Sequence, residues 1–167
     1  MMTFLPYFAK KIFVGTINPE TLLTLFMSAS GVGSIMGSLT MAWLGNMQRK
    51  GRAALTLLIC LGATISGFAL STSVWMSCLM LFLSGAALIG VFAQVNSLVQ
   101  LITTNEMRGR VMSVYNVAFR GGMPMGNLVA GRLVELFTAP VVLAVNGVVL
   151  MGVAVYFLTV HRRIAAL

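Results

Sequence analysis

The sequence predicts an all-α integral membrane protein, and its composition and charge pattern carry this prediction. Of its 167 residues, 59% are hydrophobic and 8% are charged, whereas soluble domains carry about 25% charged residues. The mean hydropathy is +0.97. The few charges separate apolar runs that are long enough to cross a bilayer as helices, for which about 20 residues suffice. We therefore expect residues 1–167 to form a single transmembrane domain.

The net charge of +8 would suit a nucleic acid as well as a membrane. The basic residues, however, do not form a stripe interleaved with aromatic residues, but interrupt apolar runs as in membrane-protein loops. We expect the lipid bilayer, and no nucleic acid, as a partner. Cys60 and Cys78 fall within predicted spans that offer no metal-ligating neighbours, so we interpret both as small core residues and expect neither a metal nor a cofactor.

The first membrane span is predicted at about 22–44. Residues 21–48, which number 28, carry no charge, and this run exceeds the length of about 20 residues that a span requires. Within it, Gly33 and Gly37 form a GxxxG pair that lets two helix backbones approach closely. Packing against another helix of the same chain is the favoured interpretation, and dimerisation is the alternative.

The second and third spans are predicted at about 53–70 and 75–102. Residues 53–105 carry no charge, and this run is too long for one span at about 1.5 Å per residue, so we place a break at the polar segment 71–73. The third span carries amides toward its far end, which either line a polar path or make hydrogen bonds between helices: Gln94, Asn96 and Gln100.

The fourth span is predicted at about 110–134, and Arg120 lies near its middle. An arginine there costs about 2.5–3.5 kcal/mol on insertion scales, so Arg120 should face a protein interior or a water-filled cavity. The alternative is a structural role, in which Arg120 satisfies carbonyl groups that Pro124 leaves without a donor. The residues that permit a helix break and close packing come next: Gly121, Gly122, Pro124 and Gly126.

The fifth span is predicted at about 140–160. Just before it, Arg132 lies near an interface, where it can reach the solvent or pair with Glu135. The lone His161 follows the span and is interpreted as a solvated end residue.

Alternate loops of a five-span protein lie on opposite sides of the membrane, and basic residues favour the cytoplasmic side. One side carries only Lys10 and Lys11. The C-terminal side is therefore predicted to be cytoplasmic, because it carries Arg49, Lys50, Arg52, Arg108, Arg110, Arg162 and Arg163. We expect residues 4–14 to end a further helix that rises from the cytoplasm, which would give a six-span unit.

Several segments resemble a known family. Asn105–Tyr115 (NEMRGRVMSVY) and Gly121–Gly126 (GGMPMG) resemble the C-terminal half of the major facilitator superfamily, in particular the branch that includes the enterobactin exporter and macrolide efflux pumps. Gly37–Leu39 followed by Gln48–Arg52 is similar to the second copy of the superfamily's loop motif. The acidic residue usual in the first copy has no counterpart around Ala42–Asn46. The resemblance covers nearly the full chain, as helices eight to twelve plus the end of helix seven.

The resemblance implies half of a transporter bundle, with five full transmembrane helices plus a partial N-terminal helix, that works by alternating access with an N-terminal half or partner six-helix unit. It implies a secondary active transporter of the bacterial inner membrane that exports a small molecule, siderophore- or drug-like, driven by protons. The residues expected to line the substrate cavity are Arg120, Asn116 and Gln94. Those expected to form a conformational latch, or alternatively a positive-inside anchor, are Glu106, Arg108 and Arg110.

Two alternatives stay open. A truncated fragment or a subunit that needs a partner half also agrees with five spans. A membrane enzyme is disfavoured, because the only histidine is terminal and no embedded Ser–His, metal-ligand or carboxylate pair is present. Proton coupling is expected to reside in the partner half, since all the acidic residues lie near interfaces: Glu20, Glu106 and Glu135.

Overall fold

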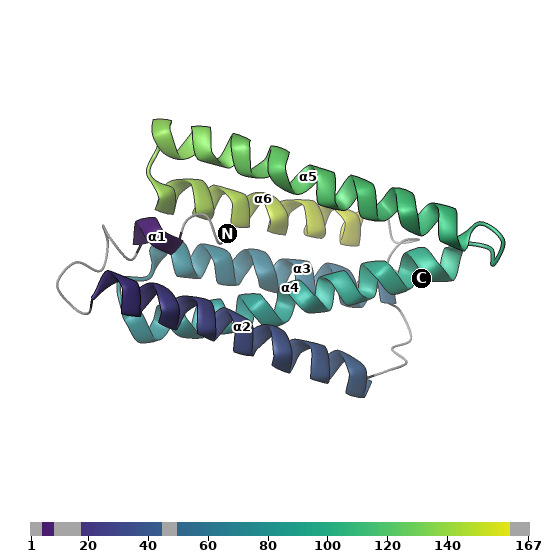
Figure 1. The fold of residues 1–167 in the computed structure, drawn as a ribbon, viewed down its shortest axis with the longest axis horizontal. Coiled ribbons are helices and arrows are strands. Elements are labelled where there is room, and N and C mark those ends of the chain that lie inside the picture. The colour runs from purple at the N-terminus through teal and green to yellow at the C-terminus, as the bar shows by residue number, and fades with distance from the viewer. Residues whose placement is uncertain (1–4, 9–17, 45–49, 161–167) are drawn as a thin grey trace.

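The computed structural model describes residues 5–8, 18–44 and 50–160, and these residues form helices joined by short links (Figure 1). The prediction of an all-helical fold is confirmed. The helices are α1 (Leu5–Tyr7), α2 (Pro19–Leu44), α3 (Lys50–Leu70), α4 (Val74–Ile102), α5 (Arg108–Leu136) and α6 (Ala139–Thr159).

The five long helices run side by side along the long axis of the molecule (Figure 1). In this view α5 and α6 lie along one edge and α2 along the other, with α3 and α4 between them. Only residues 71–73 separate α3 from α4, and only 137–138 separate α5 from α6. Because such short links reverse the chain direction, each of these two pairs is antiparallel.

Four of the described helices, rather than the five expected, are long and apolar enough to cross a membrane: α2, α3, α4 and α6. The fifth predicted span corresponds to α5, which has 29 residues and therefore sufficient length. Its apolar character is reduced by four arginines and by its glycines. The expected helix at 4–14 is described only as α1, and residues 9–14 lie outside the described part.

The helix boundaries extend beyond the predicted spans at their polar ends. The first span was expected from 22 and the helix begins at Pro19; the second was expected from 53 and the helix begins at Lys50. Hydropathy marks only the part of a helix that suits hydrocarbon. The backbone hydrogen bonds continue for a further turn into the interface, where charged side chains are solvated.

Glycines bring α2 and α4 into close contact. A Cβ atom on Gly33 would collide with the backbone carbonyl of Phe82, and one on Gly37 would lie 2.6 Å from the Cα atom of Ala86. Ser34 fills the space beside this contact, and its hydroxyl donates to the carbonyl of Gly85 over 3.4 Å. Gly33 and Gly37 thus lie against another helix of the same chain, where close packing replaces the hydrophobic effect as the source of helix association.

A second close contact joins α3 to α6. A Cβ atom on Gly62 would lie 2.5 Å from the carbonyl oxygen of Gly147. Beside it, the hydroxyl of Ser66 donates to the carbonyl oxygen of Ala144 over 3.4 Å. The bundle therefore consists of two tightly packed pairs, α2 with α4 and α3 with α6, which meet where α3 packs on α4.

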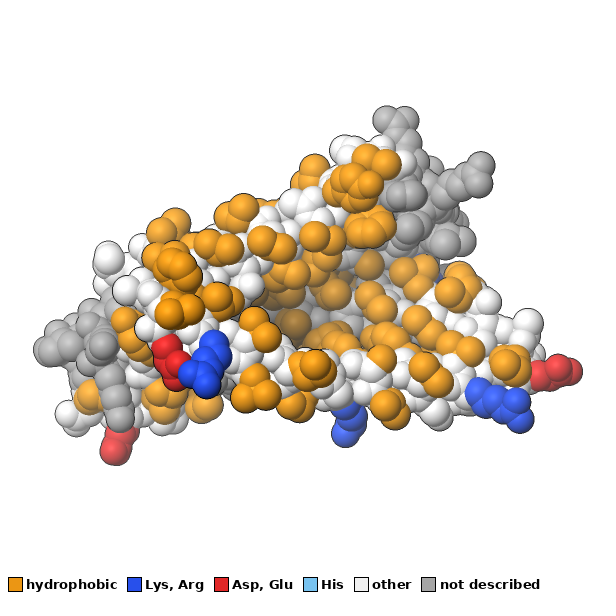
Figure 2. All heavy atoms as spheres, turned by 90° about the horizontal axis from the view of Figure 1, so that it is seen from above, with side chains coloured by type: hydrophobic (Ala, Val, Ile, Leu, Met, Phe, Trp, Pro, Cys, Tyr) orange, Lys and Arg blue, Asp and Glu red, His pale blue; other side chains and the backbone are white. Residues whose placement is uncertain are grey.

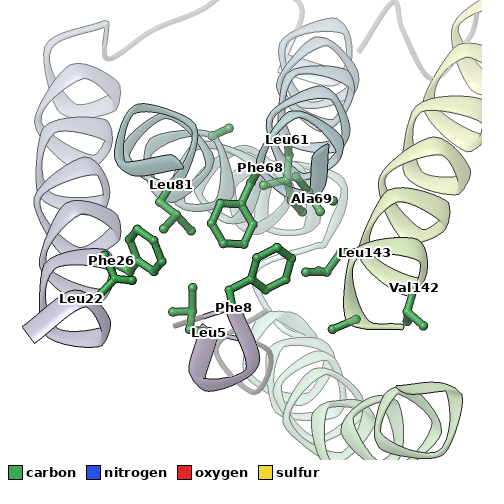
Figure 3. Close-up of a cluster of buried hydrophobic side chains, with 13 residues drawn as sticks. Leu5, Phe8, Leu22, Phe26, Leu61, Phe68, Ala69, Leu81, Val142 and Leu143 are labelled. Carbon is green, nitrogen blue, oxygen red and sulfur yellow. The ribbon is translucent and has the colours of Figure 1, made fainter. Parts of the chain in front are cut away.

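The buried core gathers at one end of the bundle, where α2, α4 and α6 begin and α3 ends (Figure 3). Phe8 lies beside Phe68, with ring centroids 4.6 Å apart, and Phe26 meets Phe68 edge to face at 5.8 Å. Leu81 and Leu143 point into the same cluster from α4 and α6 (Figure 3). Aromatic pairs of this kind add about 0.5–1.5 kcal/mol beyond the area they bury.

Away from this core the molecule is hollowed. Figure 2 shows a recess between two diverging arms, surrounded mainly by hydrophobic side chains, while the charged side chains lie along one edge and at the ends. Helix α5 makes few contacts with the rest of the bundle, and none of its residues is buried. The helix that carries Arg120 is thus the most exposed of the five long helices.

Candidate functional site

A groove of about 360 Å³ between α4 and α5 contains Arg120. Its walls combine one charge, two amides, three aromatic rings and a thioether. The lining residues are Phe92 and Asn96 from α4, and Tyr115, Asn116, Phe119, Arg120 and Met123 from α5.

Helical spacing explains why these side chains meet. On α5 they recur at intervals of three and four residues, which places them on one face of the helix. Phe92 and Asn96 are four residues apart on α4 and share a face for the same reason. One face of each helix therefore builds the groove.

The aromatic wall of the groove has a defined geometry. Phe92 and Phe119 meet edge to face, with centroids 4.8 Å apart and planes at 86°. Tyr115 stacks on Phe119 at 6.1 Å with planes 19° apart. These rings link α4 to α5 and leave Arg120 exposed at the edge of the groove. A guanidinium beside amides and ring faces can hold a ligand that has an anionic group and an apolar body.

Arg120 and Asn116 thus lie together, but Gln94 lies elsewhere. The side chain of Gln94 is 8% exposed, and its Nε2 atom lies 3.6 Å from the sulfur of Met41 on α2. Two residues along a helix differ by about 200° in direction, so Gln94 and Asn96 face opposite sides of α4. Gln94 therefore belongs to the contact with α2, while Asn96 supplies the amide of α4 to the groove.

The predicted latch residues lie at the start of α5. Glu106 is in a turn closed by a hydrogen bond from the backbone N–H of Met107 to the carbonyl of Thr104, at 3.1 Å. Arg108 and Arg110 occupy the first turn of the helix, and all three latch residues are exposed. Positive charges at a helix N-terminus oppose the helix dipole. Their position is thus unfavourable for α5 itself.

Within the described residues, the latch side chains make no ion pair. The ion pair found there joins Arg132 to Glu135 at 3.1 Å on the surface of α5. This agrees with the expected pairing of Arg132 with Glu135. Arg110 borders a second groove of about 470 Å³ between α4 and α5, whose other walls are almost entirely apolar.

A contact that sequence reasoning missed ties the start of α3 to α4. The Nζ atom of Lys50 donates a hydrogen bond to the Oγ atom of Ser97 over 2.8 Å, and both residues are half-buried. In the sequence Lys50 is one basic residue among several in a short polar segment. Only the packing of α3 against α4 in the structure distinguishes Lys50 from the other basic residues of that segment.

The small residues of α5 have open space around them. Apart from the adjacent residues and the backbone of α5 itself, a Cβ atom built on Gly121, Gly122 or Gly126 would meet no heavy atom of the described residues within 4 Å. The tight helix packing expected there is therefore not made within the described residues. Pro124 lies inside the same helix and has no N–H to donate to the carbonyl of Arg120, four residues earlier.

The groove's aromatic residues were also missed by sequence reasoning. Tyr115 and Phe119 stand four residues apart directly before Arg120, and this spacing was the available signal. An aromatic pair at helical spacing is equally common in ordinary helix packing, so the signal could not single out the groove.

Over residues 1–166 the chain matches a major facilitator family described as transmembrane secretion effector. The search of curated proteins found no match, and neither did the search of solved structures.

Proposed function

The chain belongs to the transmembrane secretion effector family of the major facilitator superfamily, and from this premise we propose that it exports a small molecule by alternating access. It is an integral membrane protein of a transporter family, and such families move solutes rather than catalyse reactions. We further propose that the chain acts as the C-terminal half of a transporter, in the branch of the enterobactin exporter and the macrolide pumps. The segments Asn105–Tyr115 and Gly121–Gly126 support this placement.

The observation that carries the proposal is the groove around Arg120. It places a cation and two amides next to three aromatic rings, on the helix that the rest of the chain covers least. A helix exposed in this way can face a central cavity. The chemistry of the groove favours a small amphipathic substrate, siderophore- or drug-like, with an anionic group.

Proton coupling is assigned to a partner six-helix unit. Arginine keeps its proton at physiological pH, so Arg120 can attract an anion or bias a nearby carboxylate but cannot carry the proton. The acidic residues of the chain lie at helix ends or in a link: Glu20, Glu106 and Glu135. A proton carrier near the middle of the membrane would therefore be a residue of the partner.

Replacement of Arg120 tests the proposal. We expect Arg120→Ala to abolish export while the amount of folded protein in the membrane stays unchanged, because the side chain is exposed and has no role in the core. Efflux of a catecholate siderophore, which has the anionic group that the groove should recognise, would be followed in cells that lack their own exporters. Arg132→Ala is the matched control on the same helix and should retain export. Equal efflux by Arg120→Ala and the unaltered protein would remove Arg120 from the mechanism.

A second candidate function is that of a subunit that transports only with a partner. The exposure of α5, in which no residue is buried, favours it, since an amphipathic helix with four arginines is stabilised by a protein neighbour rather than by lipid alone. Light scattering of the purified protein, combined with mass spectrometry of co-purified chains, distinguishes the two. A stoichiometric six-helix partner would support the subunit, and efflux by the chain alone in reconstituted vesicles would exclude it.

A further inference from the structure

A separate groove lies between α2 and α4 and shares no lining residue with the groove around Arg120. Its volume is about 770 Å³, which falls within the range of about 300–1,000 Å³ typical of small-molecule pockets. Leu25 and Val32 of α2 form part of one wall, and Trp75 and Phe82 of α4 form part of the other. The groove lies toward the end of the bundle where α2 and α4 begin.

A polar strip on α2 leads out of this groove. A smaller recess of about 420 Å³ is lined by Glu20, Thr21 and Thr24, and it shares Leu25 and Ser28 with the larger groove. Glu20, Thr24 and Ser28 are spaced by four residues and therefore share one face of the helix. The two recesses form one continuous site, about 12 Å long from Glu20 to Ser28 at 1.5 Å per residue.

Among its described lining residues, this site carries a negative charge and no positive charge. Of the described residues that line the two recesses, Glu20 is the charged one, and the others are apolar or carry a hydroxyl or thiol group. The hydroxyl of Thr24 donates to the backbone carbonyl of Glu20 over 2.9 Å and so does not occupy its carboxylate. An apolar slot with an exposed carboxylate at its mouth is complementary to a molecule with an apolar body and a positive head.

We infer that this continuous site binds an amphipathic organic cation, with its positive head at Glu20 and its apolar body between α2 and α4. The aromatic faces of Trp75 and Phe82 can stack on a flat apolar body, and they also attract positive charge. An amphipathic anion would meet repulsion from Glu20. A lipid tail would fill the apolar slot without using the carboxylate. The inference stands independently of the proposed export through the groove around Arg120.

Trp75 provides a direct reporter of binding. The chain has two tryptophans, and Trp43 is 89% exposed at the far end of α2, so Trp43→Phe leaves Trp75 as the single donor without disturbing the core. The probe is dansylcadaverine, whose dansyl ring accepts energy from tryptophan and whose amine is positive. The control probe is a dansyl carboxylate of matched chain length. The protein is held in nanodiscs, with empty nanodiscs as the baseline for partition into lipid.

We expect saturable energy transfer from Trp75 to the amine probe and no saturable transfer to the carboxylate. Glu20→Gln should weaken binding of the amine about three- to fivefold, as for loss of an exposed ion pair. Glu135→Gln removes a carboxylate from the same end of the bundle and should leave the affinity unchanged. Val32→Phe should block the slot without adding a tryptophan donor, and it should abolish the signal.

Three outcomes would overturn the inference: equal affinity of the two probes, an unchanged affinity in Glu20→Gln, or energy transfer that only rises linearly as in empty nanodiscs. If Val32→Phe fails to fold, the comparison of Glu20→Gln with Glu135→Gln still tests the inference, because both residues are exposed and neither belongs to the core.

Discussion

Lys50 joins two helices through one hydrogen bond, and this makes it a measurable contributor to stability. A hydrogen bond with a charged donor contributes about 1.5–3 kcal/mol, and half-burial places the bond to Ser97 near the lower value. We predict that Lys50→Met, which keeps most of the apolar stem, lowers the free energy of unfolding by about 1.5 kcal/mol. Denaturant unfolding in mild detergent, followed by tryptophan fluorescence, would measure the change.

A double-mutant cycle identifies the cause of this loss. Ser97→Ala alone should cost a similar amount, and the double variant should cost little more than either single one. Arg52→Met is the control, since Arg52 lies in the same first turn of α3 but is exposed. Strictly additive losses from the two substitutions would show that the bond contributes nothing.

For single residues, the sequence draws attention only to those that contrast with their neighbours. Arg120 stands out because it is a charge within an apolar run, and it could be singled out from the sequence alone. Gln94 and Asn96 have the same amide chemistry and lie two positions apart, yet one faces α2 and the other faces the groove. Which amide faces which side depends on how α4 is packed, and the sequence pattern does not contain that information.

The contact between α2 and α4 depends on the absence of side chains at its glycines. We predict that Gly33→Ala destabilises the protein by about 1–3 kcal/mol, because the added methyl group would force the helices apart at the carbonyl of Phe82. Gly31→Ala is the matched control on the same helix. A Cβ atom on Gly31 would meet nothing within 4 Å, so we expect a change of at most about 0.5 kcal/mol.

Thermal unfolding of the two variants, in the same detergent and at equal concentration, compares them directly. The expected order is a clear loss for Gly33→Ala and near-equality of Gly31→Ala with the unaltered protein. If both variants unfolded at the same temperature as the unaltered protein, then α2 and α4 would not pack as closely as the structure describes.

The helices could largely be predicted from the sequence, whereas their partners could not. Charge-free runs and the polar break at 71–73 locate α2, α3, α4 and α6 to within about three residues. The length of α5 was also evident, but its polar content keeps it from matching an apolar span. The GxxxG pair in α2 indicates close packing without naming a partner, since α3, α4 and a second copy are all consistent with that pattern.

The whole molecule has two different ends. The aromatic core joins the helices at the end where α2 and α4 begin (Figure 3), while the other end carries the basic first turns of α3 and α5. Trp75 and Trp43 are 86% and 89% exposed and lie near opposite ends of the bundle. Tryptophan favours membrane interfaces, so we expect the two residues to lie near the two bilayer surfaces.

We predict one orientation of the whole bundle in the membrane. The positive-inside rule places the basic end in the cytoplasm and the aromatic core on the outside. In a background of Cys60→Ala and Cys78→Ala, we expect Thr72→Cys to react with a membrane-impermeant maleimide in intact cells. Thr104→Cys should react only after the membrane is opened. Both threonines are exposed in links between helices, so they differ in side of the membrane rather than in access.

This orientation also bears on the direction of transport. The core closes the bundle at the end predicted to face outward, and the groove bordered by Arg110 lies toward the end predicted to face the cytoplasm. In the predicted orientation, a bundle with this shape is suited to receive a substrate from the cytoplasm. An exporter must bind its substrate there before its cavity opens to the outside. The reverse labelling pattern, with Thr104→Cys reactive in intact cells, would place the closed end inside. The shape of the bundle would then support uptake instead of export.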